Sequence, residues 1–242
     1  MTSPDAALRQ IDEGLWQVAA GVFTSNCYIH CAPGPATCVL IDPGLDPQGI
    51  DAHLAALGRT PAAVLCTHGH FDHVGGASYF QEKYGVPVYL PQADIKTMKA
   101  SNFLLMALKI PKRITLPEVT PINPITPTTP VAAGQAAPAP VEVDVEAGGA
   151  RYTYLPCAGH TPGSCLIRSG DYVFSGDSLY ARGVGLSHLP GEDRALLRAN
   201  IRALMGTLPA GVMICPGHGP TAPFGDICRE NQALLEFLQA TD

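Results

Sequence analysis

The sequence predicts an α/β protein of two similar halves, each with a sheet and covering helices, packed together as a sandwich. Short apolar runs rich in Val, Ile, Leu and Tyr alternate with segments of helical periodicity. A series of strands followed by helix, strand and helix then occurs twice along the chain. A third observation is that potential metal ligands directly follow several predicted strands, where a sheet can hold a site rigidly.

The individual elements follow from these patterns in order. Short apolar and β-branched runs predict strands at residues 15–19, 27–31, 37–42, 62–67, 86–90, 152–155, 164–168, 172–175 and 211–215. Longer periodic segments predict helices at residues 47–57, 76–84, 92–99, 193–208 and 226–239. In the fourth helix, apolar residues recur at helical spacing and predict a stripe that faces the core: Leu197, Ile201, Leu204 and Leu208.

A proline-rich stretch between residues 111 and 140 interrupts this pattern. Proline at such density excludes regular helix and most central strand, which predicts an extended surface excursion within an insertion at about 100–148. The apolar segment from Phe103 to Leu108 precedes it. Two alternatives remain for this segment: a lid or wall of a hydrophobic substrate pocket, or a short helix packed on the core.

Composition excludes several classes of function. Lys and Arg number 15 against 21 Asp and Glu, so the net charge is −6 and a nucleic-acid surface is not expected. No apolar run approaches membrane-spanning length and no secretory signal is visible, so the cytoplasm is the expected location. The eight cysteines contain no CxxC pair and mostly lie in apolar contexts, which predicts small buried side chains.

The run from Thr67 to His73 carries the chemistry. Three imidazoles and a carboxylate lie within six consecutive positions, and both groups bind borderline divalent metals such as zinc. So short a segment cannot fold four ligands onto one ion. The run therefore predicts two adjacent metal positions, with His68 and His70 facing one ion and Asp72 and His73 the other.

Three further candidates follow later in the chain. His160, Asp177 and His218 are each preceded by glycine, as expected where the backbone turns tightly to present a side chain. Asp42 follows another predicted strand. These residues are therefore expected to join the same site.

The combination resembles the metallo-β-lactamase superfamily. The pattern His68-x-His70-x-Asp72-His73, followed by the three later ligands, is typical of its fold, and the likeness spans roughly residues 15 to 220. The resemblance implies an αββα sandwich in a single domain at 1–242, with a mixed sheet and outer helices in each half. Asp42-Pro43-Gly44 is similar to the early aspartate that supports the metal ligands from behind.

Three segments are similar to glyoxalase II and its smaller bacterial relatives, which hydrolyse glutathione thioesters: residues 158–164, 175–179 and 215–220. The resemblance implies two divalent ions, zinc first, with iron and manganese as alternatives. It assigns His68, His70 and His160 to the first ion. It assigns Asp72, His73 and His218 to the second ion, and Asp177 bridges the two.

The resemblance also implies a function, a dinuclear hydrolase in which a hydroxide shared by two ions cleaves a thioester or lactone. Asp72 would orient that hydroxide and relay a proton to the leaving group. Tyr180, three residues after Asp177, resembles a tyrosine of quorum-quenching lactonases that contacts the substrate carbonyl; a structural tyrosine is the alternative. A small-molecule substrate is expected, and the apolar segment 103–108 hints at a hydrophobic acyl group.

Two competing functions remain open from the sequence. A persulfide dioxygenase of the same fold binds one iron through two histidines and an aspartate, here His68, His160 and Asp177. A non-catalytic metal-binding protein is the other alternative. The motifs are highly specific for the fold and much less so for the substrate, and they do not indicate the oligomeric state.

Overall fold

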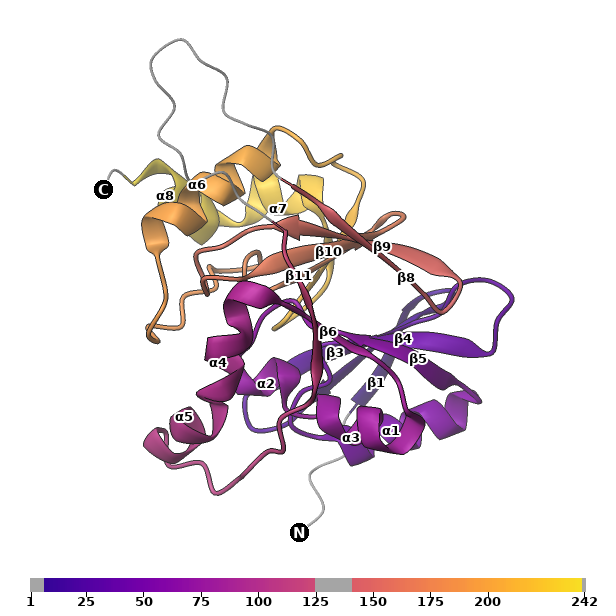
Figure 1. Cartoon of the computed structure of the whole chain (residues 1–242). Helices are drawn as coiled ribbons and strands as arrows, with labels where there is room; N and C mark the ends of the chain where they lie inside the picture. Colours follow the sequence, from indigo (N-terminus) through magenta and orange to yellow (C-terminus); the bar gives the residue numbers. More distant parts are fainter. Residues whose placement is uncertain (1–6, 125–140, 241–242) are drawn as a thin grey trace.

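Two β-sheets face each other and carry helices on their outer surfaces (Figure 1). The computed structural model describes residues 7–124 and 141–240. Within them the layers follow the order helix, sheet, sheet, helix, which confirms the predicted αββα sandwich.

The first sheet has seven strands in the order β1-β2-β3-β4-β5-β6-β7. They span Ala7–Asp12, Leu15–Ala20, Ser25–His30, Thr37–Ile41, Thr60–Leu65, Val88–Pro91 and Val119–Ile122. Neighbours from β1 to β4 are antiparallel, and those from β4 to β7 are parallel. This half also holds the helices α1 to α5, which span Pro47–Leu57, Phe71–Val74, Ala77–Tyr84, Ile95–Lys99 and Ser101–Ala107.

The second sheet has six strands in the order β13-β12-β11-β10-β9-β8. In chain order, β8 to β13 span Val143–Ala147, Ala150–Pro156, Cys165–Ser169, Tyr172–Gly176, Met213–Pro216 and Ala222–Pro223. This sheet is also mixed, because β11 and β12 run parallel while the other neighbours are antiparallel. The helices α6, α7 and α8 cover its outer face and span Arg194–Met205, Phe224–Glu230 and Gln232–Gln239 (Figure 1).

The apolar side chains form three layers that match this architecture. Along β4, Cys38 and Leu40 point toward the helices of the first half, while Val39 and Ile41 point toward the second sheet. A strand buried on both faces in this way reads as a continuous apolar run. The third layer lies between the second sheet and its helices, and the predicted α6 residues Leu197 and Ile201 are fully buried in it.

Three predicted helices differ from the structure. The helix predicted at 193–208 ends at Met205, so Leu208 lies beyond it. The helix predicted at 226–239 is two helices, because Asn231 leaves the helical conformation and its side chain accepts the amide of Leu234 to start α8. The helix predicted at 92–99 begins with the 3-10 turn Gln92–Asp94 and becomes α-helical only at Ile95.

The region around the proline-rich stretch is partly ordered. The apolar segment 103–108 lies mostly in α5, where Leu105 is fully buried while Phe103 is 64% exposed, so this helix packs on the core and also presents an apolar face. Pro121 lies in the edge strand β7, where proline is tolerated. Residues 125–140 of the predicted excursion lie outside the described residues. Among the described helices, none is long and apolar enough to cross a membrane.

Candidate metal centre

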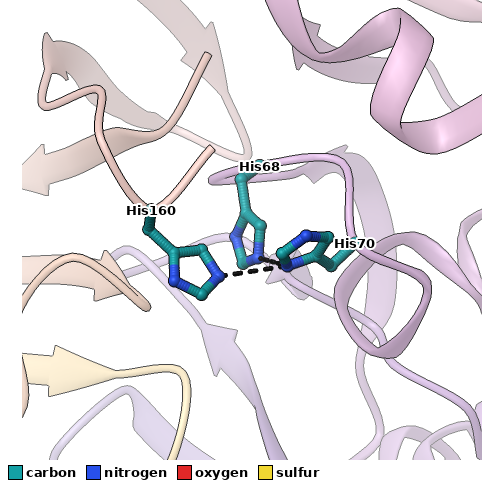
Figure 2. Close-up of side chains that lie close together, drawn as sticks. All are labelled: His68, His70 and His160. Carbon is teal, nitrogen blue, oxygen red and sulfur yellow. Dashed lines mark hydrogen bonds between the residues drawn. The ribbon is translucent and has the colours of Figure 1, made fainter. Parts of the chain in front are cut away.

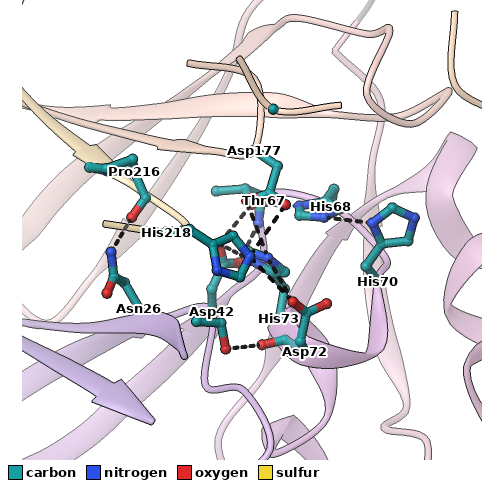
Figure 3. Close-up of polar contacts among 12 residues, drawn as sticks. Asn26, Asp42, Thr67, His68, His70, Asp72, His73, Asp177, Pro216 and His218 are labelled. Carbon is teal, nitrogen blue, oxygen red and sulfur yellow. Dashed lines mark hydrogen bonds and ion pairs between the residues drawn. The ribbon is translucent and has the colours of Figure 1, made fainter. Parts of the chain in front are cut away.

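The structure brings the predicted metal ligands together at one end of the sandwich, on the connections that follow the strands. Figure 3 labels all of them except His160. The loop after β5 carries His68 and His70, and the short helix α2 carries Asp72 and His73. The remaining three come from the second half: His160 between β9 and β10, Asp177 after β11, and His218 after β12. Each half of the fold therefore supplies part of the site.

Three histidines form the first cluster (Figure 2). His70 Nδ1 lies 3.2 Å from His68 Nε2 and 3.0 Å from His160 Nε2. All three side chains are buried. Three imidazole nitrogens that converge on one point from different loops make a ready divalent-metal site.

A second cluster, Asp72, His73 and His218, lies beside the first (Figure 3). His218 Nε2 is 3.4 Å from Asp72 Oδ2, and His73 Nε2 is 3.8 Å from the same oxygen. Asp177 lies between the clusters, because its carboxylate is 3.4 Å from His160 Nε2, 3.4 Å from His73 Nε2 and 3.5 Å from His218 Nε2.

Glycine is required next to Asp177. Gly176 has a φ of 49°, and a Cβ there would collide with Thr67 Oγ1. A Cβ on Gly217 would collide with the Asp177 carboxylate and with the His73 ring. These glycines let the backbones of β11 and β12 approach the ligands closely, which agrees with the expectation from sequence.

Buried hydrogen bonds orient the ligand rings. Asp42 Oδ2 accepts from Thr67 Oγ1 at 2.7 Å and lies 3.0 Å from His73 Nδ1, while its Oδ1 accepts the Thr67 amide at 2.8 Å. His160 Nδ1 lies 2.8 Å from the carbonyl oxygen of Gly185. With Nδ1 acting as the donor, Nε2 of each ring carries its lone pair toward the site.

Electrostatics keep two histidines of the first cluster, His68 and His70, neutral. Burial lowers the pKa of His68 well below its usual value, and neighbouring imidazoles add to that effect. Burial likewise lowers the pKa of His70 to about 4, with His160 contributing. Both rings are therefore neutral at pH 7 and can donate lone pairs.

The second cluster has the opposite balance. Burial opposes a charge on His73, but three surrounding carboxylates outweigh it and raise its pKa well above the usual value. Burial also opposes a charge on His218, and the Asp177 and Asp72 carboxylates raise its pKa to about 9. Burial raises the pKa of Asp177, but His73 and His218 overcome it and hold that pKa well below the usual value. Without other cations, these carboxylates draw protons onto the imidazoles.

The donor set fits divalent ions. His73 Nε2 and Asp177 Oδ1 are buried and have no hydrogen-bond partner among the described residues. A buried polar atom without a partner is costly, and a cation shared by these atoms would remove that cost. Imidazole with carboxylate suits zinc, iron or manganese.

A comparison with protein families agrees with this geometry. A family model described as the metallo-beta-lactamase superfamily matches residues 20–240. The chain belongs to this superfamily.

Individual members show what the chain is similar to. It is 32% identical over 211 residues to the probable metallo-hydrolase YqgX of Bacillus subtilis, and the match covers 84% of this chain and 89% of the relative. The crystal structure of TTHA1623 in a di-iron-bound form has a TM-score of 0.71 at 29% identity, covering 89% of this chain and 98% of that one. The crystal structure of the BLEG-1 B3 metallo-beta-lactamase has a TM-score of 0.68 at 26% identity, and the match covers 90% of this chain and 98% of that one. These members carry different names, so the superfamily alone does not fix the substrate.

Tyr180, which was predicted to contact the substrate, also lies close to the candidate metal centre. Its ring lies 6.0 Å from that of His218, edge to face. Burial and the neighbouring Asp177 carboxylate raise the pKa of Tyr180 well above its usual value. Tyr180 therefore keeps its proton at neutral pH and remains a hydrogen-bond donor.

Sequence reasoning missed two supports of the metallo-beta-lactamase centre. Thr67 bonds Asp42 through both its amide and its hydroxyl, although it is the first residue of the run from Thr67 to His73. The carbonyl of Gly185 holds His160, and a backbone acceptor leaves no signal in the residue type.

Proposed function

We propose that this chain is a dinuclear metallohydrolase that cleaves an ester-type bond, a thioester or a lactone, and that it belongs to the glyoxalase II-like branch of its superfamily. The observation that carries the proposal is the position of Asp177, within 3.5 Å of a histidine nitrogen from each of the two clusters. A carboxylate in this position suits two ions that share one ligand.

The residues divide between the two ions as follows. His68, His70 and His160 would hold one, and Asp72, His73 and His218 the other, with Asp177 between them. When bound, two such ions lower the pKa of water and polarise a carbonyl group. Zinc is our first choice, because imidazole and carboxylate suit it; the relative solved with two irons keeps iron in consideration.

Two side chains would act on the substrate directly. The Asp72 side chain is 12% exposed, so it reaches the open side of the centre, where it orients the attacking water and passes a proton to the leaving group. The protonated hydroxyl of Tyr180 donates a hydrogen bond to the carbonyl oxygen as negative charge develops on it. No serine or cysteine nucleophile is required.

A hydrophobic acyl group in the substrate is supported by α5. Phe103 and Met106 are 64% and 67% exposed and line a cleft of ≈ 780 Å³ together with Lys109, Lys112 and Arg113. The opposite face of α5 packs through Leu105 against Phe71, the residue before Asp72. The apolar face and the second cluster are thus parts of one packed unit.

The chain-length preference tests this part of the proposal. We expect Phe103→Ser and Met106→Ser to lower kcat/KM for long-chain esters more than for short ones, by about fourfold for each methylene that loses its contact. Hydrolysis of a homologous series of acyl thioesters measures it. Val141→Ser, at another exposed apolar position, is the control, and a parallel fall for every chain length would contradict the proposal.

Metal content and hydrolysis test the function itself. We expect about two divalent ions per chain and hydrolysis of thioesters or lactones that His68→Ala and Asp177→Ala abolish. Elemental analysis of the purified protein and a substrate panel measure both. Unchanged hydrolysis in these variants would disprove the proposal. A single bound iron with oxygen consumption on persulfide would support the dioxygenase instead, and a chain without tight metal would support a non-catalytic protein.

A further inference from the structure

Asp94 is a buried carboxylate beside the candidate metal centre, and it is not one of the proposed metal ligands. It ends the turn between β6 and α4 and is 0% exposed. Before a helix, an aspartate is ordinarily expected to cap it, but the Asp94 side chain makes no capping bond to α4. Its carboxylate is directed elsewhere.

The carboxylate accepts three hydrogen bonds from two different loops. Oδ2 accepts the amide of Gly69 at 2.7 Å and the hydroxyl of Thr161 at 2.6 Å. Oδ1 accepts the amide of Gly163 at 2.7 Å. Gly69 lies between the ligands His68 and His70, and Thr161 directly follows the ligand His160. Asp94 thus joins the two loops that make the three-histidine cluster.

Close packing fixes the same arrangement. A Cβ on Gly163 would lie 2.8 Å from Asp94 N, and a Cβ on Gly69 would lie 2.5 Å from Asp94 O. Thr161 is held further by Ser164, whose Oγ accepts the Thr161 amide at 3.0 Å. Both loops therefore press against Asp94 at positions where only glycine fits.

The two loops belong to opposite halves of the fold. His68 and His70 follow β5 of the first sheet, whereas His160 follows β9 of the second. The geometry of this cluster therefore depends on how the two loops are held relative to each other. Among the described residues, no hydrogen bond joins Asp94 to the second cluster of Asp72, His73 and His218.

We propose that Asp94 is a positioning residue that clasps these two loops and thereby sets how tightly the His68, His70 and His160 cluster holds its ion. The inference rests on the proposed function, because it takes those histidines as metal ligands. Hydrogen bonds behind ligands commonly change metal affinity about ten- to a hundredfold. Because the Asp94 hydrogen bonds reach only the loops that carry this cluster, its loss weakens the binding of one of the two ions selectively.

Asp94→Asn is the direct test. The amide has a single acceptor oxygen, so whichever way it turns, an N–H group faces either the Gly163 amide or the Gly69 amide. We expect the metal-loaded full-length variant, titrated with a chromophoric chelator, to release one ion about ten- to a hundredfold more readily than the wild type. Release of the second ion is expected to stay unchanged.

Matched variants separate positioning from general damage. Thr161→Val removes one of the three hydrogen bonds and is expected to make the same ion easier to release to the chelator. Thr161→Ser keeps the hydroxyl and is expected to release that ion as the wild type does. Asp51→Asn alters a carboxylate that also has three partners, Tyr79, Lys83 and Tyr84, away from the centre. It is expected to leave both steps unchanged.

Two results would overturn the inference: unchanged release of both ions in Asp94→Asn, or an equal weakening of both together with a lower unfolding midpoint. Failure of the proposed function looks different. A wild type that releases two ions but hydrolyses no ester contradicts that function alone and leaves the test of Asp94 valid. If the wild type shows one step, Asp94→Asn must still weaken it.

Discussion

At the scale of single residues, the centre depends on which ring nitrogen each histidine turns inward. His73 and His160 both use Nδ1 for a partner behind the ring, the Asp42 carboxylate and the Gly185 carbonyl, and both present Nε2 to the site. His70 is the exception, because its Nδ1 faces the other two histidines. Fixing the tautomer in advance removes a rearrangement that metal binding would otherwise require.

Tyr180→Phe tests the proposed donor at this scale. The variant keeps the ring and removes only the hydroxyl, so we expect kcat to fall by on the order of 10² with a small change in KM, because the lost bond acts on the developing oxyanion. Steady-state kinetics on the best thioester or lactone measures it. Tyr172→Phe, whose hydroxyl bonds Asp12, is the control, and an equal loss there or a change confined to KM would contradict the role.

Ligand types can be recognised from sequence, but the residues that hold them cannot. His68 and Asp177 stand in motifs whose chemistry is visible in the residue letters. Asp94 looks like an ordinary residue of the helix predicted at 92–99, and its role appears only when two loops distant in sequence meet at its carboxylate. Positioning by long-range contacts is a property of the tertiary structure, so periodicity and spacing do not reveal it.

At the scale of elements, the burial of a helix or strand decides how well it can be located from the sequence. The buried strands β4 and β10 contain uninterrupted apolar runs, Cys38–Ile41 and Cys165–Ile167, and were predicted within one residue at each end. The strand β1 was missed because it lies at the sheet edge, with most of its side chains exposed, and has no apolar pattern. The break between α7 and α8 was missed because apolar periodicity continues through Asn231.

Asn231 joins these two helices to the loop after Asp177. It is 4% exposed and makes four hydrogen bonds: Oδ1 accepts the amides of Gly183 and Leu234, and Nδ2 donates to the carbonyls of Tyr180 and Gly183. We expect Asn231→Ala to lower the free energy of unfolding by about 1–3 kcal/mol, because buried partners lose their bonds. Urea unfolding measures it.

The matched control for this prediction is the next residue. Gln232 is exposed and its side chain bonds that of Glu236, so Gln232→Ala is expected to change stability by less than about 0.5 kcal/mol. If the two variants unfold at the same urea concentration, the network around Asn231 does not stabilise the fold.

At the scale of the whole molecule, the two sheets are joined differently at their two ends. At one end both sheets contribute residues to the proposed metal centre. At the other, His30 of β3 contacts the second sheet: its Nδ1 lies 2.7 Å from the hydroxyl of Tyr152 on β9, and its ring meets Tyr172 on β11 edge to face. Burial lowers the pKa of His30 to about 4. Protonation there would place a charge between the sheets.

Stability should therefore depend on pH through this contact. Between about pH 6.5 and about pH 4, His30 is protonated in the unfolded chain but not in the folded chain. The contribution of neutral His30 to the free energy of unfolding is therefore complete above about pH 6.5 and is lost as the pH falls toward about 4. Linkage limits the loss to about 3 kcal/mol. The pKa of His70, a proposed metal ligand, is also lowered to about 4. The informative quantity is therefore the difference between wild type and His30→Asn, each unfolded in urea from pH 4.5 to 7.5 with the same metal content. We expect that difference to shrink toward acid pH, because the variant has no imidazole to charge. A difference that stays constant across the range would show that the sheet contact at His30 does not respond to protonation.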